Sequence, residues 1–179
     1  MKNFVMFLTY TRIFMGPIIF LLSVFGQFFF LAFLLFIFAA LSDFFDGHLA
    51  RRYKVESQLG KLLDPLADKV LLTSALFSII TITDDLFISA VALIILLREL
   101  WVAAIREFTA LNKINDATNV SNLAKIKTAT QFVAILSFYY SFSVNSSLGI
   151  FLSSFLLFLS MLITVKTALD YTLNTLKKF

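Results

Sequence analysis

Six apolar stretches of about twenty residues follow one another along this 179-residue chain, and they restrict its fold more than any other feature. A helix needs about 20 apolar residues to cross the hydrocarbon core of a bilayer. Backbone in lipid must satisfy its own hydrogen bonds, so each stretch is expected to be helical. The sequence therefore predicts an all-α integral membrane protein, a single domain over residues 1–179. Its six transmembrane helices are expected at roughly 5–25, 28–48, 63–82, 86–106, 123–143 and 148–170.

Composition supports a membrane protein and removes some kinds of site. Hydrophobic residues make up 60% of the chain, whereas a soluble domain has about half. The chain contains no cysteine, which excludes disulfides and thiolate metal sites.

The placement of basic residues predicts the orientation. The breaks at 26–27, 81–85 and 144–147 contain no Lys or Arg, whereas the other loops and both ends are basic. Short cytoplasmic loops are enriched in Lys and Arg. Both termini and the loop after the second stretch are therefore expected to face the cytoplasm.

Four aspartates lie at the predicted cytoplasmic ends of the second and third stretches. Asp43 and Asp46 are three residues apart and Asp64 and Asp68 are four apart, so each pair shares one helix face. A loop of little over ten residues is expected to make these helices antiparallel neighbours. An ionised aspartate inside a bilayer costs roughly 3 kcal/mol. Four converging carboxylates would also repel one another unless cations lay between them.

Oxygen ligands favour hard cations such as Mg²⁺ or Mn²⁺. Two ions would balance four carboxylates and could hold a diphosphate between them. Gly47 would let a phosphate approach the backbone, and Arg51 could pair with it. The alternative is a salt-bridged rim, in which the aspartates pair with nearby basic residues, namely Arg51, Arg52, Lys61 and Lys69.

The whole pattern is Asp43-x₂-Asp46-Gly47-x₂-Ala50-Arg51-x₈-Gly60-x₃-Asp64-x₃-Asp68. It resembles the signature of the CDP-alcohol phosphotransferases at every fixed position. The resemblance implies a six-helix membrane enzyme, often dimeric. Such enzymes transfer a phosphatidyl group from CDP-diacylglycerol, or a related group from another CDP-alcohol, to a hydroxyl and release CMP.

The same resemblance implies roles for the signature residues. Asp43, Asp46 and Asp64 would be metal ligands, and Asp68 would lie close to the metals and act as the general base. The CDP-binding residues would be Gly47, Ala50, Arg51 and Gly60.

Two further segments bear on the acceptor alcohol. Arg98-Glu99-x₂-Val102-x₂-Ile105-Arg106 and Lys125-Ile126-Lys127-Thr128-x₂-Gln131 resemble segments of phosphatidylglycerophosphate synthases, whose acceptor is glycerol 3-phosphate. Arg106 and Lys125 are expected to bind its phosphate, and Lys127 is a weaker candidate. Alternatively, these cations attract anionic headgroups and set the topology. Arg98 and Glu99 are expected to form a buried support pair.

The first stretch departs from that subfamily near its start. Val5 and Met6 stand where a proline and a second asparagine are usual, whereas Leu8-Thr9-x₂-Arg12 is kept. Arg12 is expected either to face the interior of the bundle or to anchor the helix by snorkelling to the membrane surface.

The leading hypothesis is a transferase that makes phosphatidylglycerophosphate from CDP-diacylglycerol and glycerol 3-phosphate. It is expected to work as a homodimer in the inner or cell membrane of a bacterium, with its site facing the cytoplasm. Membrane lipid is an expected partner and nucleic acid is not. One alternative is another member of the family, such as a cardiolipin synthase using phosphatidylglycerol as acceptor. A distant alternative is a small carrier or channel.

Overall fold

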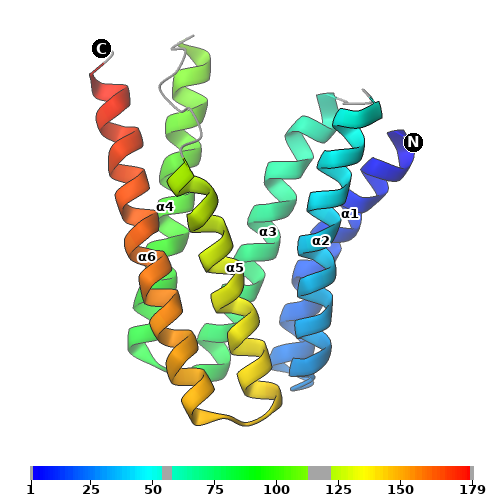
Figure 1. The fold of residues 1–179 in the computed structure, drawn as a ribbon, viewed down its shortest axis with the longest axis vertical. Helices are drawn as coiled ribbons and strands as arrows, with labels where there is room; N and C mark the ends of the chain where they lie inside the picture. Colours follow the sequence, from blue (N-terminus) through cyan, green and yellow to red (C-terminus); the bar gives the residue numbers. More distant parts are fainter. Residues whose placement is uncertain (1, 54–57, 113–121, 178–179) are drawn as a thin grey trace. The chain divides into compact units, whose positions relative to one another are not determined.

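A computed structural model describes residues 2–53, 58–112 and 122–177. The side chains at 2–5, 43–53, 58, 61–62 and 122–125 lie outside the description. Within the described ranges the chain forms six α-helices and no strand, which confirms the all-α prediction (Figure 1). The helices are α1 (Lys2–Val24), α2 (Phe29–Tyr53), α3 (Gln58–Thr83), α4 (Leu86–Leu111), α5 (Asn122–Ser143) and α6 (Ser147–Leu176).

Four helices in the described residues are long and apolar enough to cross a membrane. These candidate spans are Met6–Val24, Leu63–Thr83, Leu86–Leu111 and Ser147–Leu176. A shorter apolar segment, Phe29–Ser42, lies in the described part of α2. In length and apolar composition these four helices are consistent with a membrane protein. Each predicted stretch overlaps one of the six described helices, and the first two stretches extend one residue beyond α1 and α2.

The three breaks predicted without Lys or Arg all interrupt helices. Each contains one residue in the left-handed backbone region: Gln27, Asp84 and Asn145, with φ of 51°, 47° and 52°. Asp and Asn, the residue types at two of these positions, tolerate this conformation better than most. Asp85 then caps α4, because its Oδ1 accepts from the backbone N–H groups of Phe87 and Ile88 at 2.7 and 3.1 Å.

The helices that hold the signature are longer than expected. α2 continues to Tyr53 and α3 begins by Gln58, so the expected loop of little over ten residues is wrong. Gly60 lies within α3, and Asp64 lies in its second turn. The apolar pattern predicted where each helix enters the membrane, but helices continue into polar sequence when nothing stops them. Even Pro65 is accommodated inside α3, at the cost of one backbone hydrogen bond.

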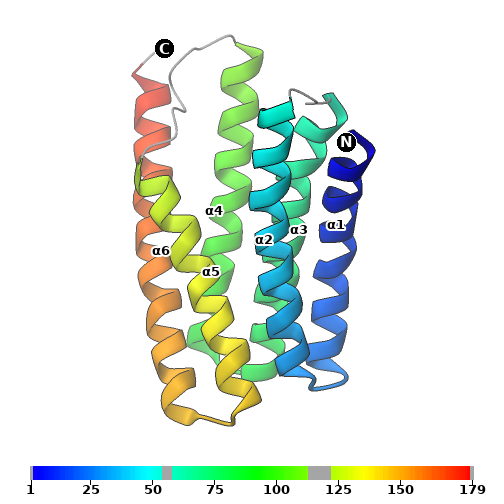
Figure 2. The ribbon, with the colours of Figure 1, turned by 45° about the vertical axis from the view of Figure 1, so that its right-hand side comes forward.

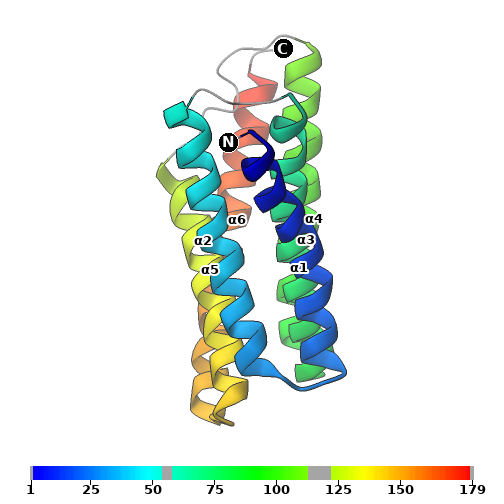
Figure 3. The same ribbon diagram turned by 90° about the vertical axis from the view of Figure 1, so that its right-hand side faces the viewer.

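The described chain divides into two compact units. The first comprises residues 1–83 and 138–146, in which α1 packs against both α2 and α3 (Figures 1 and 3). α1 and α3 run in the same direction and approach closely. A Cβ added at Gly16 would lie 3.1 Å from the Val70 carbonyl oxygen and 3.1 Å from Ser74 Oγ. The core of this unit includes Ile19, Phe36, Leu71 and Ile79.

The second unit comprises residues 84–137 and 147–179. α4 packs against α6 and runs in the same direction (Figure 2). Ile95 and Leu157 are buried within it, and Val102, Ala168 and Tyr171 form a small apolar cluster toward the ends of α4 and α6. Each unit thus pairs two parallel helices.

Candidate functional site

Asp64 and Asp68 of the signature lie one turn apart on α3 and turn toward one arginine. Arg12 Nη1 donates to Asp68 Oδ1 at 2.8 Å, and Arg12 Nη2 donates to Asp64 Oδ1 at 3.3 Å. Thr9 Oγ1 also donates to Asp64 Oδ1, at 2.8 Å. The two carboxylates therefore share a guanidinium, as their spacing on one helix face allows.

Arg12 enters this cluster from the buried side. Its side chain is 0% exposed, whereas those of Asp64 and Asp68 are 42% and 49% exposed. Gly16 lies one turn after Arg12 on α1 and permits the close approach to α3 that presents the guanidinium to the aspartates. Arg12 faces the interior, and the snorkelling alternative is wrong because carboxylates on the neighbouring helix pair with it.

The donor atoms gathered here suit a hard divalent cation. Two carboxylates, each about half exposed, lie close enough to contact the same guanidinium, and oxygen ligands are those that Mg²⁺ and Mn²⁺ prefer. Among the described side chains, no group of three or more Asp, Glu, His or Cys is close enough to hold a metal. Asp64 and Asp68 could supply two of the four predicted carboxylates, and their role as metal ligands stays a prediction.

Several predicted site residues fall where side chains lie outside the description. They are Asp43, Asp46, Gly47, Ala50 and Arg51, all on the C-terminal part of α2. α2 and α3 both belong to the first unit, which keeps the two halves of the signature in one compact part of the chain. The convergence of all four aspartates stays a prediction.

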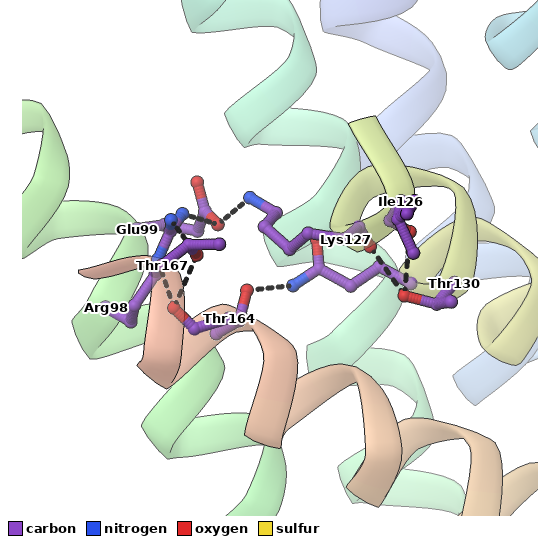
Figure 4. Close-up of polar contacts among 8 residues, drawn as sticks. Arg98, Glu99, Ile126, Lys127, Thr130, Thr164 and Thr167 are labelled. Atoms are coloured by element: carbon purple, nitrogen blue, oxygen red, sulfur yellow. Dashed lines mark hydrogen bonds and ion pairs between the residues drawn. The ribbon is translucent and has the colours of Figure 1, made fainter. Parts of the chain in front are cut away.

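A second polar cluster lies in the second unit and joins α4, α5 and α6 (Figure 4). Arg98 donates to Glu99 Oε1 at 2.9 Å, to the Thr164 carbonyl oxygen at 2.9 Å and to Thr167 Oγ1 at 2.7 Å. Lys127 Nζ donates to the same Oε1 of Glu99. Two cations therefore share one carboxylate oxygen in a largely buried position.

The Arg98–Glu99 support pair is present as predicted, whereas the contact between Lys127 and Glu99 was missed. Gln131, one turn after Lys127, donates to Thr164 Oγ1 at 3.3 Å. Lys127 and Gln131 are thus polar residues four apart on one face of α5. This four-residue spacing could have predicted that α5 has a polar face packed against neighbouring helices.

Of the two residues predicted to bind the acceptor phosphate, the structure describes only the side chain of Arg106. Arg106, on α4, is exposed, and its guanidinium carbon lies 5.7 Å from the centroid of the Tyr171 ring. Such a cation–π contact holds the guanidinium on one side of α6. The Lys125 side chain lies outside the description.

The described chain is all-helical with four long apolar candidate membrane spans, and it carries two carboxylates one turn apart on α3. The model of the CDP-alcohol phosphatidyltransferase family matches residues 2–166, and the chain belongs to this family. Members of the family generally use divalent metal ions.

Curated relatives narrow the comparison. One from Wigglesworthia glossinidia brevipalpis is 38% identical over 133 residues, covering 72% of this chain and 73% of the relative. One from Rickettsia typhi is 40% identical over 137 residues, covering 75% of each. One from Rickettsia prowazekii is 40% identical over 136 residues, covering 75% of this chain and 73% of the relative. All three are named CDP-diacylglycerol–glycerol-3-phosphate 3-phosphatidyltransferase.

Proposed function

We propose that this chain transfers the phosphatidyl group of CDP-diacylglycerol to a hydroxyl of glycerol 3-phosphate, giving phosphatidylglycerophosphate and CMP. The observation that carries the proposal is the paired, half-exposed arrangement of Asp64 and Asp68 beside Arg12. These are two of the four signature carboxylates, in a chain that matches the family over residues 2–166. The names of the relatives support glycerol 3-phosphate as the acceptor.

The roles of the signature carboxylates follow from their chemistry. Asp43, Asp46 and Asp64 would hold two divalent cations, the number that balances the charge of the four signature carboxylates. When bound, these cations would neutralise the negative charge of the diphosphate. Asp68 accepts the proton of the acceptor hydroxyl. The hydroxyl oxygen forms a bond to the phosphorus that carries the diacylglycerol, and the bond from that phosphorus to CMP breaks.

The remaining site residues bind the two substrates. Gly47, Ala50 and Gly60 are small and let the nucleotide approach the helices, while Arg51 pairs with its phosphate. Arg106 and Lys125 bind the phosphate of glycerol 3-phosphate. The cation–π contact between Arg106 and Tyr171 supports this role by limiting where the guanidinium can lie.

We further propose that the chain is one domain of six transmembrane helices, with both termini and the site at the cytoplasmic face of a bacterial membrane. Four apolar spans and three breaks without Lys or Arg support this topology. A homodimer is the proposed assembly, as the resemblance to the family implies.

The decisive experiment is an acceptor screen with labelled CDP-diacylglycerol and the purified full chain in detergent micelles. CMP release and labelled lipid should both require glycerol 3-phosphate and Mg²⁺ or Mn²⁺. Product formed with phosphatidylglycerol instead would make the chain a cardiolipin synthase. Metal-dependent ion flux in vesicles without CMP would reject transferase activity.

A further inference from the structure

We propose that Arg12 is a positioning residue, which holds Asp64 and Asp68 in one arrangement so that Asp64 can receive a divalent cation with Asp68 beside it. The inference rests on the proposed function for the identity of those carboxylates as site residues. Arg12 is not one of the signature residues. It lies 52 residues before Asp64 and 56 before Asp68.

The geometry of the guanidinium is suited to this role. Its two terminal nitrogens lie in one rigid plane, and one donates to each aspartate. A single planar group thus fixes two carboxylates relative to each other, which a compact ammonium cannot do. Both contacts use the Oδ1 atom.

Burial separates the side occupied by Arg12 from the side open to a ligand. Arg12 is fully buried while both aspartates are about half exposed, so the arginine supports the carboxylates from the protein interior. A cation that approaches from the side opposite Arg12 meets the exposed part of each carboxylate. Partners that orient metal ligands in this way strongly affect metal affinity.

Thr9 adds a second support on the same helix face. It lies three residues before Arg12, and its hydroxyl donates to the Asp64 oxygen that also contacts Arg12. Asp64 is therefore oriented by two donors from α1. The Thr9-x₂-Arg12 spacing in the sequence places both donors on one face of α1.

The competing interpretation is that Arg12 merely joins α1 to α3. Metal binding separates the two interpretations, because a purely structural tie would change stability without changing the affinity of the folded protein for a cation. Mn²⁺ binding to the purified full chain with CDP present can be measured from the loss of the free-ion electron paramagnetic resonance signal.

We expect Arg12→Gln to weaken Mn²⁺ binding roughly 10–100-fold, the range typical when such a supporting partner is removed. Arg12→Lys keeps the charge without the fork and should recover part of the loss. Helical content by circular dichroism shows whether each variant is folded. Wild-type affinity in folded Arg12→Gln, or full recovery in Arg12→Lys, would overturn the inference.

A threonine pair keeps the test decisive if the arginine variants fail to fold. Thr9→Val should weaken Mn²⁺ binding, by less than Arg12→Gln. Thr11→Val is the matched control, because Thr11 donates to the carbonyl oxygens of Phe7 and Leu8 in its own helix. Equal Mn²⁺ affinity in the two valine variants would contradict the inference, as would a wild-type protein that binds no Mn²⁺.

The outcome is independent of the acceptor screen. A wild-type enzyme that uses glycerol 3-phosphate, together with unchanged Mn²⁺ binding in folded Arg12→Gln, would remove this inference and leave the proposed function. Weakened Mn²⁺ binding in Arg12→Gln, in a protein that uses another acceptor, would support this inference and reject glycerol 3-phosphate as the acceptor.

Discussion

The two polar clusters have opposite charge arrangements. In the first unit two carboxylates, Asp64 and Asp68, contact the guanidinium of Arg12. In the second unit two cations, Arg98 and Lys127, contact one carboxylate oxygen of Glu99. Among the described side chains, the first cluster has an excess of acid that is about half exposed, whereas the second cluster is largely buried.

The difference in exposure indicates different uses. Glu99 is 19% exposed, and Arg98 has two further partners on α6, so the second cluster ties helices together. The side chains of Asp64 and Asp68 in the first cluster are 42% and 49% exposed. We therefore propose that the buried cluster serves packing and that the exposed cluster serves ligand binding.

The largest expected effect lies in the accessible cluster. Asp68→Asn removes the proposed base and should lower turnover roughly 10²–10⁴-fold. Binding of CDP-diacylglycerol in the presence of metal should persist, because Asp43, Asp46 and Asp64 remain. Steady-state CMP release and equilibrium binding measure the two effects.

Asp46→Asn is the matched variant for that prediction, since it should weaken metal and nucleotide binding together. Equal, modest losses of turnover and binding in both variants would contradict the division between base and ligand.

The buried cluster should respond in stability instead. Glu99→Gln leaves Arg98 and Lys127 without their shared negative charge, and breaking a buried ion pair costs about 3 kcal/mol. Denaturant unfolding in micelles measures the free energy. Glu107→Gln is the control, because Glu107 lies on the same helix and is exposed. Similar stability of the two variants would mean that the second cluster does not join its helices energetically.

Helix spacing in the first unit should have the next effect. Gly16→Ala places a methyl group 3.1 Å from the Val70 carbonyl oxygen, and overpacking of this kind costs about 2 kcal/mol. Because Arg12 lies one turn away, Mn²⁺ affinity should fall along with the free energy of unfolding. Hydrogen exchange on α4 and α6 should stay as in the wild type. Unchanged Mn²⁺ affinity would show that the spacing of α1 and α3 does not control the carboxylates.

The smallest effect is expected at Lys127. Lys127→Met removes one of two cations on Glu99 and leaves Arg98 in place, so the loss should be about 1 kcal/mol. The variant with both Lys127→Met and Glu99→Gln should be less destabilised than the sum of the single changes, since the two residues interact. Additivity in denaturant unfolding would indicate that the contact is not coupled.

Local patterns predicted much of this protein, and contacts distant in sequence accounted for most of what was missed. The apolar stretches and uncharged breaks gave the six helices, and the four-residue spacing put Asp64 and Asp68 on one face. Arg12, which pairs with these aspartates, lies on another helix. The sequence therefore could not decide whether the Arg12 side chain points into the protein or toward the membrane surface. Lys127 meets Glu99 across 28 residues for the same reason. The polar ends of α2 and α3 were missed because hydropathy identifies apolar segments. It does not detect a helix that continues through polar residues by backbone hydrogen bonding.

The distance along the chain between Arg12 and its carboxylates also sets an order of events during synthesis. Asp64 follows 52 residues later, so at about 5–20 residues per second the arginine waits roughly 3–10 s for it. A lone guanidinium is costly in hydrocarbon during that interval. We therefore expect α1 to enter the bilayer together with α3 rather than ahead of it. Ribosome-arrested chains that end before residue 64 should leave α1 extractable by alkali, and chains that expose Asp68 should not.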